Sequence, residues 1–547
     1  MRVLSPAQVK PLLTDGAEIA FVDVREHGQY GEGHPFFCVN LPYSKIEGLA
    51  PRLMPRRSVR CVVLDAGDGV AERAAAVLQG LGYGDVSVLA GGAAAWEAAG
   101  FNLFKGVNGP SKAFGEVVEH ELGTPSVSAE ELLRMQAEDC NLLVLDGRSE
   151  REFQKMSLPG ARSCPNAELA YRLPALARDP DTEIVVNCAG RTRSIIGAET
   201  LRLLGLPNRV RALRNGTQGW QLAGFQLRHG ERAQSLPDLG DVDRQLGLSR
   251  ARALQRDYRL NVIDLEQLRR LQAEPNRSTF LFDVRSAAEF ARAHVDGARH
   301  APGGQLVQAT DEQLAVRNAR IVLSCDKGLR ATTTAIWLAG MGHEVHVLDE
   351  DASGHVDFAS APEPPPIAST LDAATLRARV DAGARVLDVS LGMAFRAAHI
   401  KGAQWGTRAR LEPARLGDVE ELVVVGRCPA LIAGAVRELA SLTGKAPRHI
   451  LHGTPADWEA AGLSLVATPD DPSEEACIDH LFFVHDRHDG NLDAARRYLE
   501  WELGLLAQLD AQERSVLKPL RPVPSRQGAP APAVDSASCA SFSGPVL

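Results

Sequence analysis

The residues best suited to covalent chemistry surround Cys188. This cysteine ends the apolar run EIVVNC, and the helix that follows is predicted to begin at Ser194. Between them lie five loop residues that could bind a substrate: Ala189, Gly190, Arg191, Thr192 and Arg193. Because helix N-termini and arginines stabilise anions, we expect the pKa of the Cys188 thiol to be depressed. The segment predicts a nucleophilic thiolate beside a binding site for a small anion.

A second candidate catalytic residue is Cys325, which ends the run RIVLSC. The loop from Cys325 to Arg330 again spans six residues before a helical pattern. Asp326 beside the thiol opposes anion binding, whereas Lys327 and Arg330 favour it. The residues leave open whether Cys325 is active.

Both cysteines belong to a pattern that recurs four times along the chain. A short apolar run ends in an aspartate in IAFVDVRE, LLVLDGRS, FLFDVRS and RVLDVSL, at Asp23, Asp146, Asp283 and Asp388. A second apolar run ends 42 residues later in the first three copies and about 37 residues later in the fourth. An alanine-rich helical pattern and a further β-rich run follow each time. Strands that alternate with helices predict an α/β fold of four tandem modules, each a small parallel sheet with helices on both faces.

The first and fourth copies lack a cysteine at the end of the second run. The first has Asp65 there, and Asp68 follows, so this loop would repel an anion. In the fourth copy the run ends at Val425, and Cys428 comes three residues too late. We expect these two modules to be structural or to bind partners.

Breaks in the pattern give the predicted boundaries. The four modules are expected at 1–105, 124–230, 259–352 and 367–467, with a stiff proline linker at 361–366. Residues 468–520 are predicted to form a helical segment, and residues 521–547, rich in Pro, Ala and Ser, a disordered tail. The helical segment carries an apolar stripe that we expect to pack plainly against the body of the protein: Tyr498, Leu499, Trp501, Leu505 and Leu506.

Composition excludes several classes of function. The chain has 547 residues, a formal net charge of −9 and 24% charged residues, which disfavours nucleic-acid and anionic-membrane partners. Nine scattered cysteines suit a reducing compartment better than a disulfide framework, and no leader or membrane span is visible, so we expect a cytoplasmic protein. The spacing of His480, His485 and His488 fits no standard metal motif, and we predict no metal and no cofactor.

The motifs around the strand-end aspartates resemble those of the rhodanese family over most of residues 1–466. The second copy gives DGRSEREFQKMSLPGARSCP, the third DVRSAAEFARAHVDGARHAP and the fourth DVSLGMAFRAAHIKGAQW. The family's closing Gly and Trp recur with Trp96, Trp220 and Trp458 but are missing from the third copy. The resemblance implies that Asp146 and Arg148 form a structural hydrogen-bonded pair. It also implies a ping-pong sulfurtransferase, in which Cys188 takes sulfur from thiosulfate as a persulfide and passes it to cyanide or a cellular thiol.

Two alternatives remain at this stage. A phosphatase that shares this fold also uses a loop cysteine and arginine, but its loop has five residues between them. Here only four residues separate Cys188 from Arg193, and the shorter loop fits a sulfur atom better than a phosphate. The other alternative is a scaffold or sulfur relay, in which inactive modules bind a partner and one active module passes sulfur to an acceptor protein.

Overall fold

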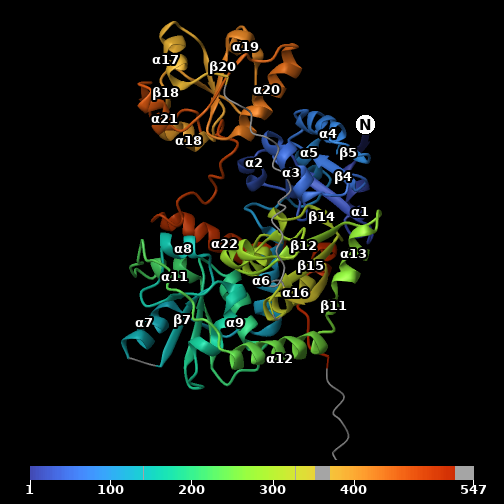
Figure 1. Ribbon diagram of the computed structural model, residues 1–547, viewed down its shortest axis with the longest axis vertical. Helices are drawn as coiled ribbons and strands as arrows, with labels where there is room; N and C mark the ends of the chain where they lie inside the picture. Colours follow the sequence, from blue (N-terminus) through green and yellow to red (C-terminus); the bar gives the residue numbers. More distant parts are fainter. Residues whose placement is uncertain (139–140, 327, 352–369, 524–547) are drawn as a thin grey trace, which may run out of the picture.

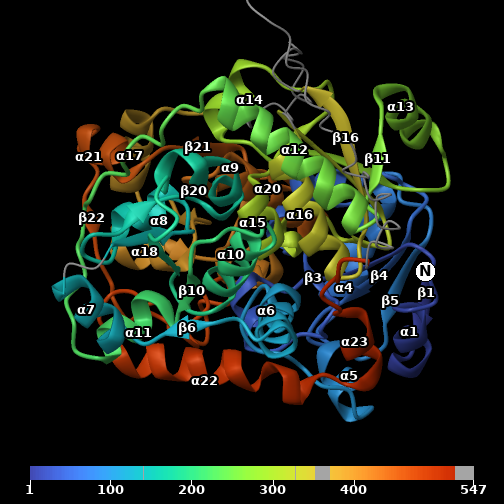
Figure 2. The same ribbon diagram turned by 90° about the horizontal axis from the view of Figure 1, so that it is seen from below.

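The structure is a computed structural model that describes residues 1–138, 141–326, 328–351 and 370–523 (Figures 1 and 2). These residues form four α/β modules and a C-terminal helical segment, as the repeat predicts. Lys327, the proline linker at 361–366 and all but the first three residues of the predicted tail lie outside the described residues.

Each of the first three modules has its own sheet, and all three sheets have the same topology. Five parallel strands lie in the spatial order first, fifth, fourth, second, third along the module's sequence. In that order the first module has β1 (Arg2–Leu4), β5 (Val86–Leu89), β4 (Arg60–Leu64), β2 (Ile19–Asp23) and β3 (Val39–Asn40). The second has β6 (Ser126–Val127), β10 (Val210–Leu213), β9 (Glu183–Asn187), β7 (Leu142–Asp146) and β8 (Arg162–Ser163). The third has β11 (Asn261–Ile263), β16 (Glu344–Asp351), β15 (Arg320–Cys325), β12 (Thr279–Asp283) and β13 (Arg299–His300).

The fourth module keeps four of these positions. Its parallel strands are β19 (Gln404–Trp405), β17 (Val386–Asp388), β20 (Val423–Gly426) and β21 (His449–His452). Within the described residues it has no counterpart of the first strand.

Helices cover both faces of each sheet because the strands alternate apolar side chains to both sides. In the second module α7 (Ala129–Ala137) and α11 (Gly216–Leu222) pack on one face, against Val144 and Val185. On the other face α9 (Asn166–Leu176) and α10 (Thr192–Arg202) pack against Leu145 and Val186. The helices that follow the fourth strand in the other modules are α4 (Val70–Gly80), α16 (Leu329–Gly340) and α20 (Pro429–Thr443). This arrangement supplies each module with its own core.

A buried ion pair closes the end of the second strand in each of the first three modules. In the second module the Arg148 guanidinium donates to both carboxylate oxygens of Asp146, at 2.9 and 2.7 Å, and to the Met156 carbonyl at 2.7 Å. The fourth module has Ser390 at the arginine position, and Arg427 from the next loop donates to the equivalent carbonyl instead, that of Ala398. The guanidinium group that Ser390 lacks is therefore supplied by Arg427, at the end of β20.

The modules associate in two pairs, the second with the third and the first with the fourth (Figure 1). The contact lies twenty or twenty-one residues after each strand-end aspartate. Asn166 at the start of α9 meets Gly304 at the start of α15 (Gly303–Gln308). In the other pair, the Arg408 guanidinium donates to the Tyr43 carbonyl at 3.2 Å.

The first and third modules are joined directly. A short strand of the third module, β14 (Val316–Arg317), pairs antiparallel with β2 at the edge of the first sheet. The first module's sheet therefore includes a strand of the third module, and these two modules are not structurally independent.

Two further helices connect the modules, α6 (Gly109–Leu122) before the second and α12 (Asp241–Asp257) before the third. The C-terminal segment ends in α22 (Leu492–Gln508) and α23 (Ala511–Val516). Figure 2 shows α22 lying along α6 and α11. Among the residues that the structure describes, no helix is both long and apolar enough to cross a bilayer.

Candidate active site at Cys188

Strand β9 delivers Cys188 to the carboxyl end of the second sheet, where α10 begins. The helix starts at Thr192, two residues before the predicted start at Ser194. The prediction was wrong because Ser194 already belongs to the first turn, where both its hydroxyl and its backbone N–H donate to the Arg191 carbonyl. The loop proper is therefore Cys188 to Arg191.

Backbone contacts with the start of α11 hold this loop in place. The Thr217 N–H donates to the Cys188 carbonyl at 2.8 Å, and the Gln218 N–H donates to the Ala189 carbonyl at 3.1 Å. Gly216 has a φ of +54°, and a Cβ there would lie 2.2 Å from the Cys188 carbonyl oxygen. Only glycine permits this approach, so the turn before α11 fixes the nucleophile's backbone.

The Cys188 thiol is buried, with 2% of its surface exposed. Burial raises its pKa, while the Arg193 charge and hydrogen bonds from the hydroxyl and N–H of Ser194 act in the opposite direction. The expectation of a depressed pKa was wrong because the loss of solvent outweighs the helix terminus and the arginine.

The two loop arginines are engaged by carboxylates. Arg191 pairs in a bidentate manner with Glu116 of α6, at 2.7 and 2.9 Å, and also contacts Glu119. Arg193 pairs in the same way with Glu152, at 2.8 and 2.7 Å. The sequence suggested that both guanidinium groups hold an anionic donor, but in this structure their charges are balanced by neighbours.

A cavity of about 460 Å³ opens beside Cys188 and extends well beyond the second module. Its lining includes Gln305 and Gln308 of α15, Lys112 of α6 and Arg487 of the C-terminal segment. Histidines aside, five basic and three acidic side chains face it. Arg191 and Arg193 are already paired with carboxylates, so the positive charge left for an anionic ligand comes from Lys112, Arg151 and Arg487.

The C-terminal helix forms one wall of this cavity through Tyr498, Trp501 and Glu502. The prediction that its apolar stripe serves only packing is thus incomplete. Leu499 and Leu505 are buried in cores, but Tyr498 and Trp501 also line the cavity. Glu502 escaped notice because a single glutamate on a helix carries no local signal.

Cys325 has the same backbone setting but a closed surrounding. The Ala331 N–H faces its sulfur at 3.4 Å, and burial together with Asp326 raises its pKa to about 12. Helix α9 of the second module covers the loop, where the Tyr171 hydroxyl donates to Asp326 at 2.6 Å and Glu168 accepts from Arg330 at 2.5 Å.

Helix α15 of the third module faces the Cys188 loop as α9 faces the Cys325 loop. On α15, Gln305 stands in the place of Glu168 and Gln308 in the place of Tyr171. The two sites are thus related by the pairing of the modules but differ in these side chains. Smaller neutral groups leave space at Cys188, whereas a tyrosine and two carboxylates fill the space at Cys325.

The first and fourth modules have no cysteine at the position of Cys188. Asp65 accepts from the N–H groups of Gly67 and Ala71, at 2.8 and 2.9 Å, so its carboxylate occupies the position of the thiolate. In the fourth module β20 ends at Gly426, one residue beyond the predicted end at Val425. Asp388 pairs with Val425 as Asp146 pairs with Asn187, so Gly426 is the counterpart of Cys188, and Cys428 lies two residues later, partly buried at the N-cap of α20.

Comparison with known proteins agrees with this architecture. A family model described as a rhodanese-like domain matches residues 5–99, 128–223 and 264–354, which together make up more than half of the chain. The chain belongs to the rhodanese-like family. This confirms the family predicted from the motifs.

Two relatives of this rhodanese-like protein are informative. It matches the crystal structure of thiosulfate sulfurtransferase from Pseudomonas aeruginosa at 40% identity and a TM-score of 0.87, covering 95% of this chain and 100% of that one. It is also 35% identical over 112 residues to an HTH-type transcriptional regulator of Mycobacterium tuberculosis, covering 20% of this chain. The match spans 48% of that regulator, about half its length. Together the family and the Pseudomonas structure support sulfurtransferase activity in general.

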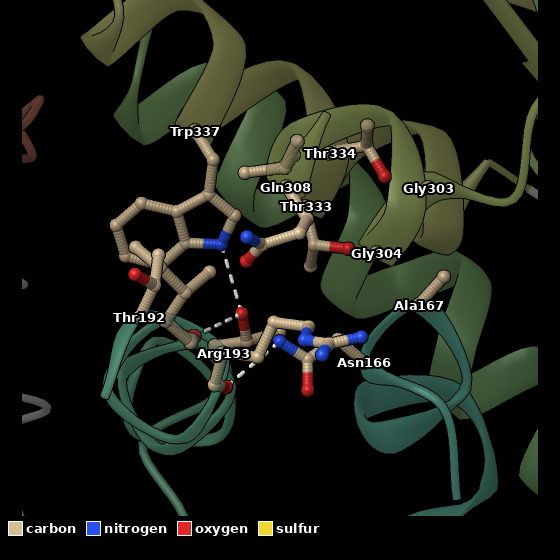
Figure 3. A pocket seen from close by; sticks show the side chains of 13 residues that line it. Asn166, Ala167, Thr192, Arg193, Gly303, Gly304, Gln308, Thr333, Thr334 and Trp337 are labelled. Atoms are coloured by element: carbon tan, nitrogen blue, oxygen red, sulfur yellow. Dashed lines mark hydrogen bonds between the residues drawn. The ribbon is translucent and has the colours of Figure 1, made fainter. Parts of the chain in front are cut away.

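A smaller pocket lies between the second and third rhodanese-like modules, behind Arg193 (Figure 3). The Trp337 indole donates to the Thr200 hydroxyl at 2.8 Å, and the Asn166 amide donates to the Arg193 carbonyl at 2.9 Å. At about 20 Å³ the space suits a water molecule rather than a substrate. The first contact joins α10 to α16 and the second joins α10 to α9, and both support the Cys188 loop from behind.

The histidines singled out in the sequence lie near the start of α22. His480 and His485 contact each other through ring nitrogens 3.0 Å apart. Across the described ranges, no group of three or more His, Cys, Asp or Glu side chains is arranged to hold a metal ion.

Proposed function

We propose that this protein is a sulfurtransferase that moves sulfane sulfur from thiosulfate, or a similar anionic donor, to a thiol or cyanide through a persulfide on Cys188. The observation that carries the proposal is the cavity beside Cys188, since the equivalent positions hold Asp65, the covered Cys325 and Gly426. The seven described cysteines are free thiols, which suits the cytoplasm as its location.

The first half-reaction loads the cysteine. The Cys188 thiolate attacks the outer sulfur of thiosulfate, the bond between the two donor sulfurs breaks, and sulfite leaves with the electron pair. Lys112 and Arg487 bring positive charge to the cavity for the sulfonate oxygens. Arg193, already paired with Glu152, acts on the thiolate rather than as a free anion site.

The persulfide then takes the place of the thiolate at the start of α10. The Ser194 N–H and hydroxyl stabilise negative charge on the sulfur attached to the cysteine. An acceptor attacks the outer sulfur, and the Cys188 thiolate is the leaving group. No cofactor is needed for either step.

The second candidate function is a sulfur relay, in which the outer sulfur goes to an acceptor protein. The observation that favours it is the number of modules with no open cysteine site among the described residues, which leaves them available to bind partners. The two functions share the loading step and differ in the acceptor.

The test measures thiosulfate and cyanide turnover in the wild type, Cys188→Ser and Cys325→Ser, with mass spectrometry of the thiosulfate-treated proteins. Turnover lost only in Cys188→Ser, with an added sulfur on the Cys188 peptide, supports the enzyme. Negligible turnover with a stable persulfide on Cys188 supports the relay. Sulfur on neither cysteine refutes both.

A further inference from the structure

Glu502 of the C-terminal helix is the group near Cys188 that the loading step does not use. It is 1% exposed, and its Oε1 accepts from the Thr192 hydroxyl at 2.8 Å. Its Oε2 is also buried and has no hydrogen-bond partner among the described residues. A buried carboxylate oxygen without a partner is costly, so a ligand that donates a hydrogen bond at this position is expected.

This free oxygen lies against the loop that carries the nucleophile. A Cβ placed on Gly190 would lie 3.1 Å from Oε2 of Glu502 and 3.4 Å from the amide nitrogen of Gln218. The carboxylate interacts electrostatically with the Cys188 sulfur, whose pKa it raises. Both groups line the one cavity of about 460 Å³. Glu502 and the sulfur can therefore face the same bound molecule.

Charged groups surround Glu502 on every side, and none of them is hydrogen-bonded to Oε2. From α6 it faces Lys112, whose amine donates to the Tyr498 hydroxyl at 2.8 Å, and Glu116. From the loop it faces Arg191, which is paired with Glu116, and on its own helix Tyr498.

We propose that Glu502 is a catalytic base for the second half-reaction, taking the proton of a small thiol as that thiol attacks the persulfide. The proposal rests on the proposed function and deepens it by naming thiols as the acceptor class. The S–H proton moves to Oε2 while the thiol sulfur bonds to the outer sulfur of the persulfide. The bond to the Cys188 sulfur breaks, and its electron pair remains on Cys188 as thiolate.

The chemistry of the acceptor explains why a base is needed. A free thiol with a pKa of about 8.5 is mostly protonated at neutral pH, and the thiolate is the nucleophile. Sulfite attacks the same sulfur without giving up a proton. A base therefore accelerates the reaction with a thiol and leaves the reaction with sulfite nearly unchanged.

The experiment is a single-turnover measurement on full-length protein loaded with thiosulfate and freed of excess donor. The loaded protein is mixed with 2-mercaptoethanol or with sulfite between pH 6.5 and 10, and loss of the persulfide is followed by mass spectrometry. The variant is Glu502→Gln, which keeps the shape and the Thr192 hydrogen bond. Its control is Glu500→Gln, the same change on the exposed side of α22.

We expect Glu502→Gln to lose about 100-fold in rate with the thiol at pH 7, the lower end of general-base effects, and less than twofold with sulfite. The thiol defect should shrink as the pH rises past the pKa of the acceptor, because the acceptor is then already ionised. Equal losses with both acceptors, or a thiol defect that is constant with pH, would overturn the role of Glu502. Failure of the wild type to load would instead refute the proposed function.

Discussion

Cys325 should become more reactive when Asp326 is replaced by the alanine found beside Cys188 and the Tyr171 hydroxyl that binds Asp326 is removed. The change is Asp326→Ala together with Tyr171→Phe, since Ala189 stands where Asp326 does. The Tyr171 hydroxyl donates to the Asp326 carboxylate at 2.6 Å, and removing both groups together leaves neither of them buried without a partner. Arg330 keeps its ion pairs with Glu168 and Glu289.

The magnitude follows from the charge of Asp326. A carboxylate on the neighbouring residue interacts with a thiolate by roughly 2–3 kcal/mol at an effective dielectric constant of about 20. Arg330 already neutralises part of this charge, so we expect the Cys325 pKa to fall by about one unit from its value of about 12. One unit corresponds to a tenfold larger thiolate fraction at pH 8, roughly 1.4 kcal/mol. The lost contacts should lower the free energy of unfolding by about 1–3 kcal/mol.

The assay is alkylation by iodoacetamide at pH 8, resolved by peptide mass mapping in a Cys188→Ser background. The Cys325 peptide should be modified at least ten times faster than in Cys188→Ser alone. Near-UV circular dichroism checks that packing is native. An unchanged alkylation rate in a natively packed variant would refute the reasoning, because burial by other groups would then control Cys325.

Three further predictions test the Cys188 site. Burial raises the pKa of Cys188 above its ordinary value near 9, so the thiolate fraction should keep rising with pH up to at least pH 9. The rate of Cys188 alkylation should therefore increase about tenfold per pH unit between pH 7 and 9, and a plateau near pH 7 would contradict this. Gly216→Ala should abolish persulfide loading and cost more than about 2 kcal/mol in urea unfolding, because its Cβ would meet the Cys188 carbonyl at 2.2 Å. Gly224→Ala, which has a φ of +85° but open space around it, should cost only about 1 kcal/mol and keep loading; similar losses in the two would be inconsistent with a steric cause. Trp337→Phe should lose about 0.5–1.5 kcal/mol through the hydrogen bond to the Thr200 hydroxyl, which keeps its own bond to the Ile196 carbonyl; thermal unfolding measures this, with a wild-type midpoint as the contrary result.

Local patterns were sufficient to predict much of the fold. The strands are apolar on both faces and recur at a fixed distance from an aspartate, so the four modules could be recognised from the sequence. The Asp146–Arg148 contact, which the family resemblance implied, joins residues only two apart. The helical character of the C-terminal segment likewise followed from its own periodicity.

Features that depend on distant partners were not predictable. The carboxylate that engages Arg191 comes from Glu116, 75 residues earlier, and Glu502 reaches Thr192 across 310 residues. The pKa of Cys188 was predicted in the wrong direction because the charges were visible in the sequence and the depth of burial was not. Such long-range contacts arise from the packing of modules and leave no mark in a local motif.

The wall that α22 contributes to the Cys188 cavity has a consequence for biosynthesis. Domains generally fold as units while the ribosome is still translating, N-terminal ones first. The second module can thus be complete long before Glu502 is made, and the edge strand that the first sheet takes from residues 316–317 also comes late. A polypeptide terminated before α22 would carry a folded second module whose Cys188 cavity lacks one wall. The enclosed cavity therefore forms only in chains whose synthesis has passed α22.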